Sequence, residues 1–458
     1  SSLTLILFRF RAGNSPIFIM AEKIESSREG GIDAPTRHAL DWTNPDFYNQ
    51  DKIDEELYRT FEICHGCRRC VSLCDAYPTL FDLIDESPSY DIDTVEKSDY
   101  NKVVDECYMC DLCYQTKCPY VPPHPWALDF PHLMLRAKAK KFKDKKDGLQ
   151  KRIRNKLLSS TDFTMKYGSI PLVDVTINTL NGSQIVRKPL EGLLGIHAKA
   201  DLPKFKSNNL KKRVEKLTNS VDKVQANEST TGKVMVFGTC YCNFSVPEVG
   251  EDLFSVFRHN NIQTELMQQE KCCGMPKFEL GDLESVKKAK EYNAPRFLEA
   301  INDGYDIVAA VPSCVLMFKQ ELPLMFPDDE GLQKIKSRIF DPFEYLSLRD
   351  KDGLLKKDFK KEFDKISYQA ACHQRVQNIG PKTKEILSLI PGAEIDMIER
   401  CSGHDGTYAV KKESHETSIK IRKPVVSKVE RFDPKTFTSD CPMAAKHVGN
   451  GVTTETET

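Results

Sequence analysis

The chain has 458 residues, of which 29% are charged and 40% hydrophobic, so it is long enough for roughly three folded domains and wholesale disorder is excluded. Lys and Arg total 66 against 67 Asp and Glu, and this balance argues against a nucleic-acid binder. Its 16 cysteines are the unusual feature. In a long chain, with dense groups at metal-ligand spacing, they indicate metal binding in a reducing compartment rather than a secreted disulfide scaffold.

The first 40 residues are expected to be a flexible N-terminus. Residues 1–19 have a short apolar patch and two arginines but lack the apolar core and the cleavage site of a signal peptide. Because Met20 begins more ordinary sequence, we interpret residues 1–19 as non-native, with a targeting peptide as the alternative.

Residues 41–132 are predicted to form a ferredoxin-type domain. Ile53, Leu57 and Phe61 recur at helical spacing and predict a helix that leads into two dense groups of cysteines. Each group is an iron–sulfur ligand run, in which three thiolates at steps of three residues reach three corners of a cubane. The runs are Cys64-x2-Cys67-x2-Cys70-x3-Cys74 and Cys107-x2-Cys110-x2-Cys113-x4-Cys118-Pro119.

Two 4Fe-4S clusters follow from this spacing. The fourth cysteine of such a run usually ligates the other cluster of the pair. The assignment is therefore Cys64, Cys67, Cys70 and Cys118 for cluster 1, and Cys74, Cys107, Cys110 and Cys113 for cluster 2. A pair of zinc sites is the alternative, but zinc modules use two separated cysteine pairs for each ion, which fits these runs poorly.

Residues 133–229 are predicted to be a basic helical connector. Its first part, 133–158, has eleven Lys and Arg against two Asp, a local charge of +9, with leucines and isoleucine interspersed. Two interpretations stay open: a solvated helix face, or docking to an anionic membrane surface or an acidic partner.

From residue 230 the pattern predicts strands that alternate with helices, which indicates parallel α/β layers. Each predicted strand ends just before a cysteine, and Cys372, Cys401 and Cys441 follow Cys240, Cys272 and Cys314 at offsets of 132, 129 and 127 residues. Such near-constant offsets indicate a duplication. The predicted units are repeat 1 at 230–335, repeat 2 at 336–450 and a disordered tail at 451–458. The expected strands are 233–237, 264–268, 307–311, 366–371, 394–398 and 437–440.

The repeats offer further thiolate ligands at the carboxyl ends of strands, where open parallel sheets bind ligands. Repeat 1 has Cys240, Cys272, Cys273 and Cys314, and repeat 2 has Cys372, Cys401 and Cys441. Gly274 and Gly403 lie beside these cysteines and permit the unusual backbone angles that would let the thiolates converge. Cys242 is left over as a spare.

These motifs resemble a known family. The repeats resemble the cysteine-rich CCG domains of heterodisulfide reductase catalytic subunits. Together with the N-terminal runs they look like the iron–sulfur subunit of anaerobic glycerol-3-phosphate dehydrogenase and related Fe-S oxidoreductases, including rubrerythrin-associated members. The stretches that carry the resemblance are Cys64-His-Gly-Cys-Arg-Arg-Cys-Val-Ser-Leu-Cys74, the run from Cys107 to His124, and Cys401-Ser-Gly-His-Asp-Gly-Thr-Tyr408.

The resemblance implies a helical two-cluster ferredoxin domain followed by a duplicated α/β CCG domain, which can hold one or two further clusters. It implies electron transfer from a flavoprotein towards quinone or another acceptor, by a subunit that is not catalytic alone. The chain departs from the five-cysteine pattern, because Met317 and Ala444 occupy the last positions and Ser402 replaces one thiolate. Candidate residues other than cysteine are His373, Arg375, His404 and His415.

Two functions stay open. One is an electron-transfer subunit, with quinone or rubrerythrin as acceptor, and the other is an oxidoreductase that reduces a substrate such as a disulfide at the CCG cysteines. No G-x-G-x-x-G follows a predicted strand, so neither FAD nor NAD is expected on this chain. We expect a cytoplasmic protein, peripheral on the cytoplasmic face of the membrane if the basic stretch docks there.

Overall fold

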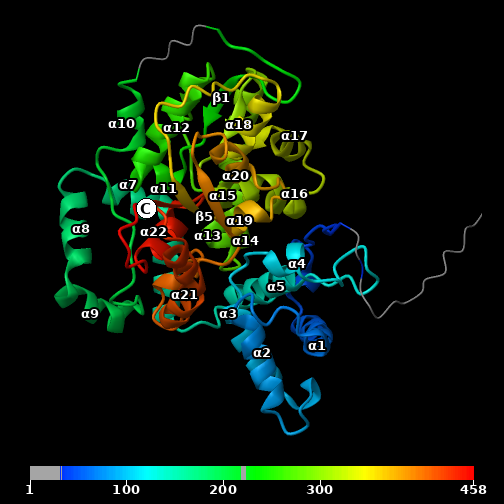
Figure 1. Ribbon diagram of the computed structural model, residues 1–458. Helices are drawn as coiled ribbons and strands as arrows, with labels where there is room; N and C mark the ends of the chain where they lie inside the picture. The colour runs from blue at the N-terminus through cyan, green and yellow to red at the C-terminus, as the bar shows by residue number, and fades with distance from the viewer. Residues whose placement is uncertain (1–30, 32–33, 218–222) are drawn as a thin grey trace, which may run out of the picture.

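The computed structural model describes residues 31, 34–217 and 223–458. Its fold is mixed, as predicted, with a helical N-terminal domain and two parallel sheets further along the chain (Figure 1). Among the described residues, no helix combines the length and the apolar composition that crossing a bilayer requires.

The N-terminal domain is built from short helices around the two cysteine runs. Ile53, Leu57 and Phe61 are buried on one face of α1, as their spacing predicts. The helix ends where Arg68 adopts a left-handed backbone (φ 51°), which turns the chain directly after Cys67. The helices are η1 (Pro45–Tyr48), α1 (Gln50–Cys67), α2 (Ala76–Asp85), η2 (Ile92–Thr94), η3 (Lys97–Asp99), α3 (Tyr100–Glu106), α4 (Leu112–Thr116) and α5 (Phe130–Lys143).

Repeat 1 is a parallel sheet of order β2-β1-β3-β4, covered by helices. Its strands are β1 (Lys233–Val236), β2 (Gln263–Leu266), β3 (Asp306–Val308) and β4 (Ile339–Phe340). Its helices are α11 (Thr239–Phe244), α12 (Pro247–His259), α13 (Met275–Phe278), α14 (Leu283–Asn302), α15 (Pro312–Leu316), η4 (Met317–Glu321), α16 (Leu322–Met325), α17 (Glu330–Arg338) and α18 (Pro342–Lys351).

Repeat 2 is a second parallel sheet, of order β6-β5-β7. In both sheets the first strand lies in the middle, with the second and third strands on either side, which is the same topology twice. The strands are β5 (Lys365–Gln369), β6 (Glu394–Ile398) and β7 (Thr436–Ser439). The helices are α19 (Cys372–Arg375), α20 (Lys382–Leu387), η5 (Tyr408–Val410), α21 (His415–Phe432) and α22 (Pro442–Gly449). A reversal of strand order at a central strand opens a crevice at the carboxyl ends, where the cysteines lie.

The connector consists of α6 (Leu149–Ser159), α7 (Thr161–Gly168), α8 (Val173–Gly182), α9 (Gln184–Leu194) and α10 (Leu210–Val214). The beginning of the predicted basic stretch belongs instead to α5, whose apolar residues are buried in the N-terminal core. The basic residues of α5 are largely engaged within the protein: Lys138 binds the Cys107 carbonyl, Arg136 the Phe47 carbonyl, and Lys141 the carboxylate of Asp105.

Three predicted boundaries differ from the structure. The described part of the N-terminal segment is fixed, because Thr36 donates to the Pro122 carbonyl at 2.9 Å and Leu40 to the Leu324 carbonyl at 2.8 Å. Residues 1–30, which include the segment interpreted as non-native, lie outside the described residues. Repeat 1 extends past 335, because β4 pairs with β3.

The predicted disordered tail is the third difference. Glu457 forms a parallel bridge with Thr436, accepts from Phe437 at 2.7 Å and donates to the Lys435 carbonyl at 3.0 Å. The exposed edge of β7 has backbone groups that need partners, and the last residues of the chain supply them.

Candidate iron–sulfur sites and the cavity between the repeats

The structure gathers the cysteines of the N-terminal domain into two groups. Cys64, Cys67, Cys70 and Cys118 line a small pocket between α1 and the Pro119 turn, and this group is here named site 1. Burial, together with Cys118, Cys70 and Cys67, raises the pKa of the Cys64 thiol well above its ordinary value. These four residues are the set that the sequence assigns to cluster 1.

The second group, here named site 2, contains Cys74, Cys107, Cys110 and Cys113. Burial and then Cys110 and Cys107 raise the pKa of Cys74 well above its ordinary value. Burial and then Cys110 and Cys70 do the same for the pKa of Cys113, which lies between the two sites. Cys74 comes from the first run and the other three from the second, so the exchange of fourth cysteines that the spacing predicts is the arrangement in the structure.

These donor sets fit iron–sulfur clusters. Thiols that are buried and crowded together resist ionisation, because thiolates in that surrounding repel one another and lose hydration. A cationic iron centre supplies the compensating charge, and each site presents four sulfur atoms to it. Burial raises the pKa of Cys107 to about 12, so this ligand depends on the metal for its ionised form.

Repeat 1 brings its four cysteines into contact. Hydrogen bonds from Cys240 and Cys273 hold the pKa of Cys272 well below its ordinary value, and Cys273 also contacts Cys314. All four lie at the carboxyl ends of β1, β2 and β3, so this set fits one further cluster. Cys242 is buried and interacts with Thr239, and the wall of the cavity described below includes Cys240 but not Cys242.

Sequence reasoning missed the residue that holds the Cys240 loop. The Glu270 carboxylate accepts a hydrogen bond from the Gly238 N–H at 2.9 Å. Burial raises the pKa of Glu270 to about 8. An isolated glutamate gives no signal in the sequence.

Repeat 2 divides its three cysteines. Cys372 contacts both Cys401 and Cys110 of site 2, so two of the three join the N-terminal domain. The hydrogen bond from Cys372 lowers the pKa of Cys401 to about 7, and the Tyr108 hydroxyl lies 3.4 Å from the Cys401 sulfur. The Cys441 thiol instead accepts from the N–H groups of Ala444 and Met443 at the start of α22.

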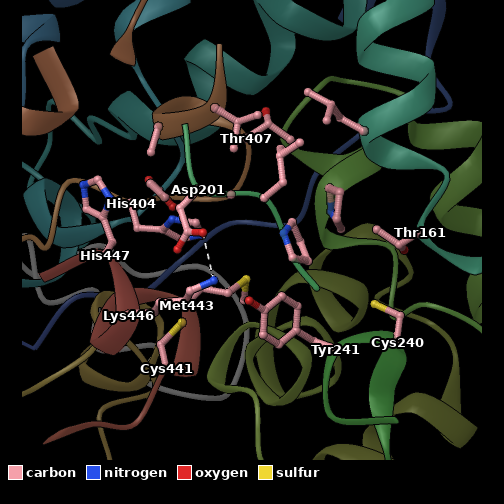
Figure 2. Close-up of a pocket in the computed structure, with 18 of the residues that line it drawn as sticks. Thr161, Asp201, Cys240, Tyr241, His404, Thr407, Cys441, Met443, Lys446 and His447 are labelled. Atoms are coloured by element: carbon pink, nitrogen blue, oxygen red, sulfur yellow. Dashed lines mark hydrogen bonds and ion pairs between the residues drawn. The ribbon is translucent and has the colours of Figure 1, made fainter. Parts of the chain in front are cut away.

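One cavity of about 960 Å³ joins the cysteines of both repeats. Figure 2 shows Cys240 and Cys441 on its wall with Tyr241 between them. Its walls also contain Cys272, Cys314, Cys372 and Cys401, and apolar side chains from α6 to α9 complete the lining. The arrangement provides an apolar chamber with thiols at one end.

The four candidate residues other than cysteine have different places. His373 is buried, with Nδ1 2.8 Å from the Ser313 hydroxyl and Nε2 3.4 Å from the Met109 carbonyl, and thus connects the repeats with the N-terminal domain. Burial lowers the pKa of His404 to about 4, and its Nε2 lies in the cavity region without a hydrogen-bond partner. The ring of His415 has Nδ1 2.8 Å from the Ala409 carbonyl and stacks on His197, and Arg375 pairs with Glu399 near the surface.

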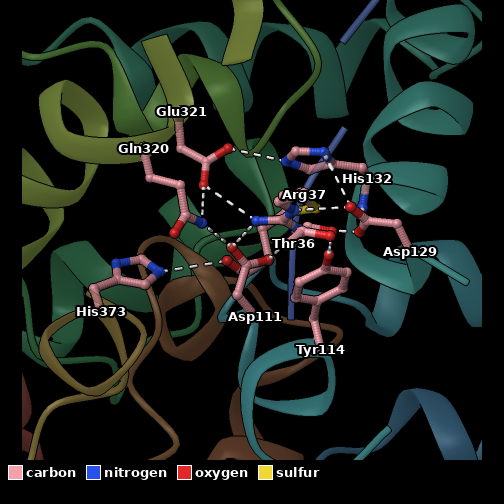
Figure 3. Close-up of polar contacts among 10 residues, drawn as sticks. Thr36, Arg37, Asp111, Tyr114, Asp129, His132, Gln320, Glu321 and His373 are labelled. Carbon is pink, nitrogen blue, oxygen red and sulfur yellow. Dashed lines mark hydrogen bonds and ion pairs between the residues drawn. The ribbon is translucent and has the colours of Figure 1, made fainter. Parts of the chain in front are cut away.

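A buried ion network, which the sequence did not indicate, fixes the N-terminal domain against repeat 1. Figure 3 shows Arg37 between Asp111 and Asp129, with Glu321 of η4 at its other side. His132 Nε2 lies 3.0 Å from Glu321. Burial by itself would raise the pKa of Asp129, but Arg37 and His132 lower it to about 2.

The glycines beside the cysteine motifs have the predicted positive φ angles, 101° at Gly274 and 78° at Gly403. A Cβ at Gly403 would lie 2.3 Å from the Ser418 carbonyl oxygen, whereas one at Gly274 would meet no atom closer than 3.6 Å. We therefore expect Gly403→Ala to lower the free energy of unfolding by more than ~2 kcal/mol, and Gly274→Ala by only ~1–2 kcal/mol from backbone strain. Anaerobic urea denaturation checks this, and equal losses in the two variants would contradict it.

Comparison with known proteins agrees with these sites. Residues 63–121 match the family model of the 4Fe-4S dicluster domain, and residues 234–319 match that of the cysteine-rich domain named CCG. One subunit of anaerobic glycerol-3-phosphate dehydrogenase from Escherichia coli K12, designated C, is 28% identical over 306 residues, which cover 65% of this chain and 73% of the relative. Lactate utilization protein A 1 of Bacillus mycoides is 26% identical over 189 residues, covering 39% of this chain and 74% of the relative. The chain is thus an iron–sulfur protein homologous to that dehydrogenase subunit, with a 4Fe-4S dicluster domain followed by a cysteine-rich CCG domain.

Proposed function

We propose that this protein is the electron-transfer subunit of an oxidoreductase, which takes electrons from a flavoprotein dehydrogenase or similar donor and passes them to quinone or another acceptor. The contact between Cys110 of site 2 and Cys372 of repeat 2 carries the proposal. It makes the N-terminal cysteines continuous with the cavity between the repeats. Bound clusters would carry single electrons along this line.

The order of sites supports a direction for the relay. Site 1 lies against α1 and the Pro119 turn, at the far end of the N-terminal domain from the repeats, and Cys113 lies between site 1 and site 2. From site 2, Tyr108 and Tyr408 pack together with Cys401. We therefore propose that the donor docks near site 1 and that the acceptor is reduced in the cavity.

Anaerobic reconstitution with iron and sulfide tests the cofactor content. We expect at least eight irons and eight acid-labile sulfides per chain, four for each of sites 1 and 2, and about four more if repeat 1 is occupied. Fewer than eight irons, or zinc without acid-labile sulfide, would contradict two cubane clusters.

A second candidate is direct reduction of a substrate, such as a disulfide, at the CCG cysteines. The cavity favours it, because thiols of both repeats face a chamber large enough for a small molecule. Turnover of a disulfide by the isolated chain with an artificial electron donor would support this candidate. Turnover only after a flavoprotein is added would support the relay, and reduction of rubrerythrin in the same assay would identify the acceptor. We place the protein in the cytoplasm, peripheral on the cytoplasmic face of the membrane.

A further inference from the structure

Exposed apolar side chains are concentrated in one part of the molecule. Twelve of the twenty large hydrophobic residues that the structure exposes lie between Leu149 and Leu193, a tenth of the chain. They include Leu172, Ile185 and Leu193, whose exposed fractions are 80%, 86% and 69%. Helices α6 to α9, which contain nearly all of them, are here named the docking surface, and Figure 1 shows α8 and α9 at the periphery, far from the N-terminal domain.

The arrangement along the helices is amphipathic. On α6, Leu149, Ile153 and Leu157 follow one another at four-residue intervals and are all exposed. On α7, the rings of Phe163 and Tyr167 are paired, with centroids 4.7 Å apart, and both are more than half exposed. Water is a poor surrounding for so many neighbouring apolar groups, and patches of this kind mark interaction sites.

Leu172 is strained as well as exposed. Its φ of 73° is a conformation that a bulky L-residue rarely adopts, and it begins the turn into α8. A backbone that costs free energy in order to present a leucine to solvent is consistent with a side chain that inserts into another phase.

The charges of the docking surface identify the phase. Lys151, Arg152, Lys156, Lys166 and Lys188 are exposed among the apolar residues. The three acidic residues of the same segment are engaged within the protein: Asp162 accepts from the Cys272 N–H, Asp174 from Ser207 and Glu191 from Ala198. Exposed apolar side chains beside unopposed lysines and arginines are the pattern of helices that lie in the interface of an anionic bilayer.

The cavity opens through this surface. Leu157, Phe163, Tyr167 and Val173 are exposed and at the same time line the cavity whose other end holds the cysteines of the two repeats. A molecule dissolved in the bilayer could therefore reach these cysteines without passing through water. The opening places the entry on α6, α7 and α8.

We propose that α6–α9 dock the protein on an anionic lipid bilayer and that the cavity opening lets a lipid-dissolved electron acceptor enter from it. This inference rests on the proposed relay, names the surface that the relay uses, and moves the membrane contact from the basic stretch 133–158 to residues 149–193. In α5 the basic residues already have partners in the protein, whereas those of α6–α9 named above face solvent.

Flotation of the reconstituted holoprotein with vesicles tests the docking surface. We expect binding to vesicles of phosphatidylcholine with phosphatidylglycerol, and binding at least tenfold weaker to phosphatidylcholine alone, with affinity that falls as salt is added. The double variant Leu172→Glu/Ile185→Glu, at two positions too exposed to affect folding, should lose at least tenfold in affinity. The control Tyr90→Glu, whose side chain is 72% exposed in the N-terminal domain, should bind as the unchanged protein does.

Three outcomes would overturn the docking surface: no binding of the holoprotein to anionic vesicles, full binding by the double variant, or a dimer in light scattering that the double variant abolishes. Re-oxidation of the reduced protein by ferricyanide and by long-chain ubiquinone in the vesicles separates this inference from the relay. In the double variant only the reaction with ubiquinone should slow. If the unchanged protein passes no electrons to ferricyanide, the relay is wrong whatever the vesicles show.

Discussion

Cys110→Ala is expected to lower the iron content by about four atoms per chain and to slow electron passage from a reduced donor to a soluble acceptor by at least a hundredfold. Cys110 serves two purposes in the structure, because it belongs to site 2 and contacts Cys372 of repeat 2. Its removal takes one of four thiolates from the site and breaks the contact between the N-terminal domain and the cavity. Iron and sulfide assays together with stopped-flow re-oxidation measure both effects.

The matched control is Cys242→Ala. Cys242 is also buried, and the substitution removes the same sulfur atom, but this residue belongs to neither N-terminal site. We expect the control to keep its iron content and its rate. The spectrum of site 1 should survive in Cys110→Ala, because its four thiols are intact. Full iron content in Cys110→Ala would show that the assignment of site 2 is wrong.

Arg37→Ala is expected to lower the free energy of unfolding by ~3–5 kcal/mol, the usual cost of leaving buried charges without their partner. Arg37 is 2.6 Å from Asp111, 2.8 Å from Asp129 and 3.4 Å from Glu321, and all three carboxylates would lose it at once. Arg37 and His132 hold the pKa of Glu321 at about 2 against burial, so this carboxylate stays charged at neutral pH. Anaerobic denaturation of the holoprotein at pH 7 gives the change.

Lys52→Ala is the control for the network. Lys52 also forms an ion pair, with Asp46, but both side chains are more than half exposed. Exposed pairs contribute little, so we expect little change in stability. Equal effects of the two substitutions would mean that the Arg37 network is solvated and does not hold the N-terminal domain to repeat 1.

The elements with strong local signals were predictable from the sequence. β6 spans Glu394–Ile398 as predicted, and α1 buries Ile53, Leu57 and Phe61 on one face. A strand or an amphipathic helix repeats its pattern over neighbouring residues, so a short window suffices to identify it. The ligand runs are equally local, because a tight loop around a cubane requires a fixed spacing.

The features that the sequence did not indicate depend on residues far apart in the chain. Arg37 is an ordinary arginine in a polar segment until Glu321 and Asp129 are placed around it. Likewise, nothing near Glu457 indicates that the last residues complete the edge of β7. The sequence assigns both residues to flexible or disordered ends, since composition describes a segment and not the surface on which it packs.

The cysteines show the same division. Spacing and strand order are properties of the chain, so the amino-acid sequence is enough to identify the thiols of the two N-terminal runs and the duplication of the α/β unit. It does not indicate that Cys372 and Cys401 join site 2 while Cys441 lies apart on the cavity wall, which depends on tertiary packing. Equivalent positions in two repeats pack against different neighbours. Repeat 2 lies against the N-terminal domain at Tyr108, and this packing directs its thiols towards site 2.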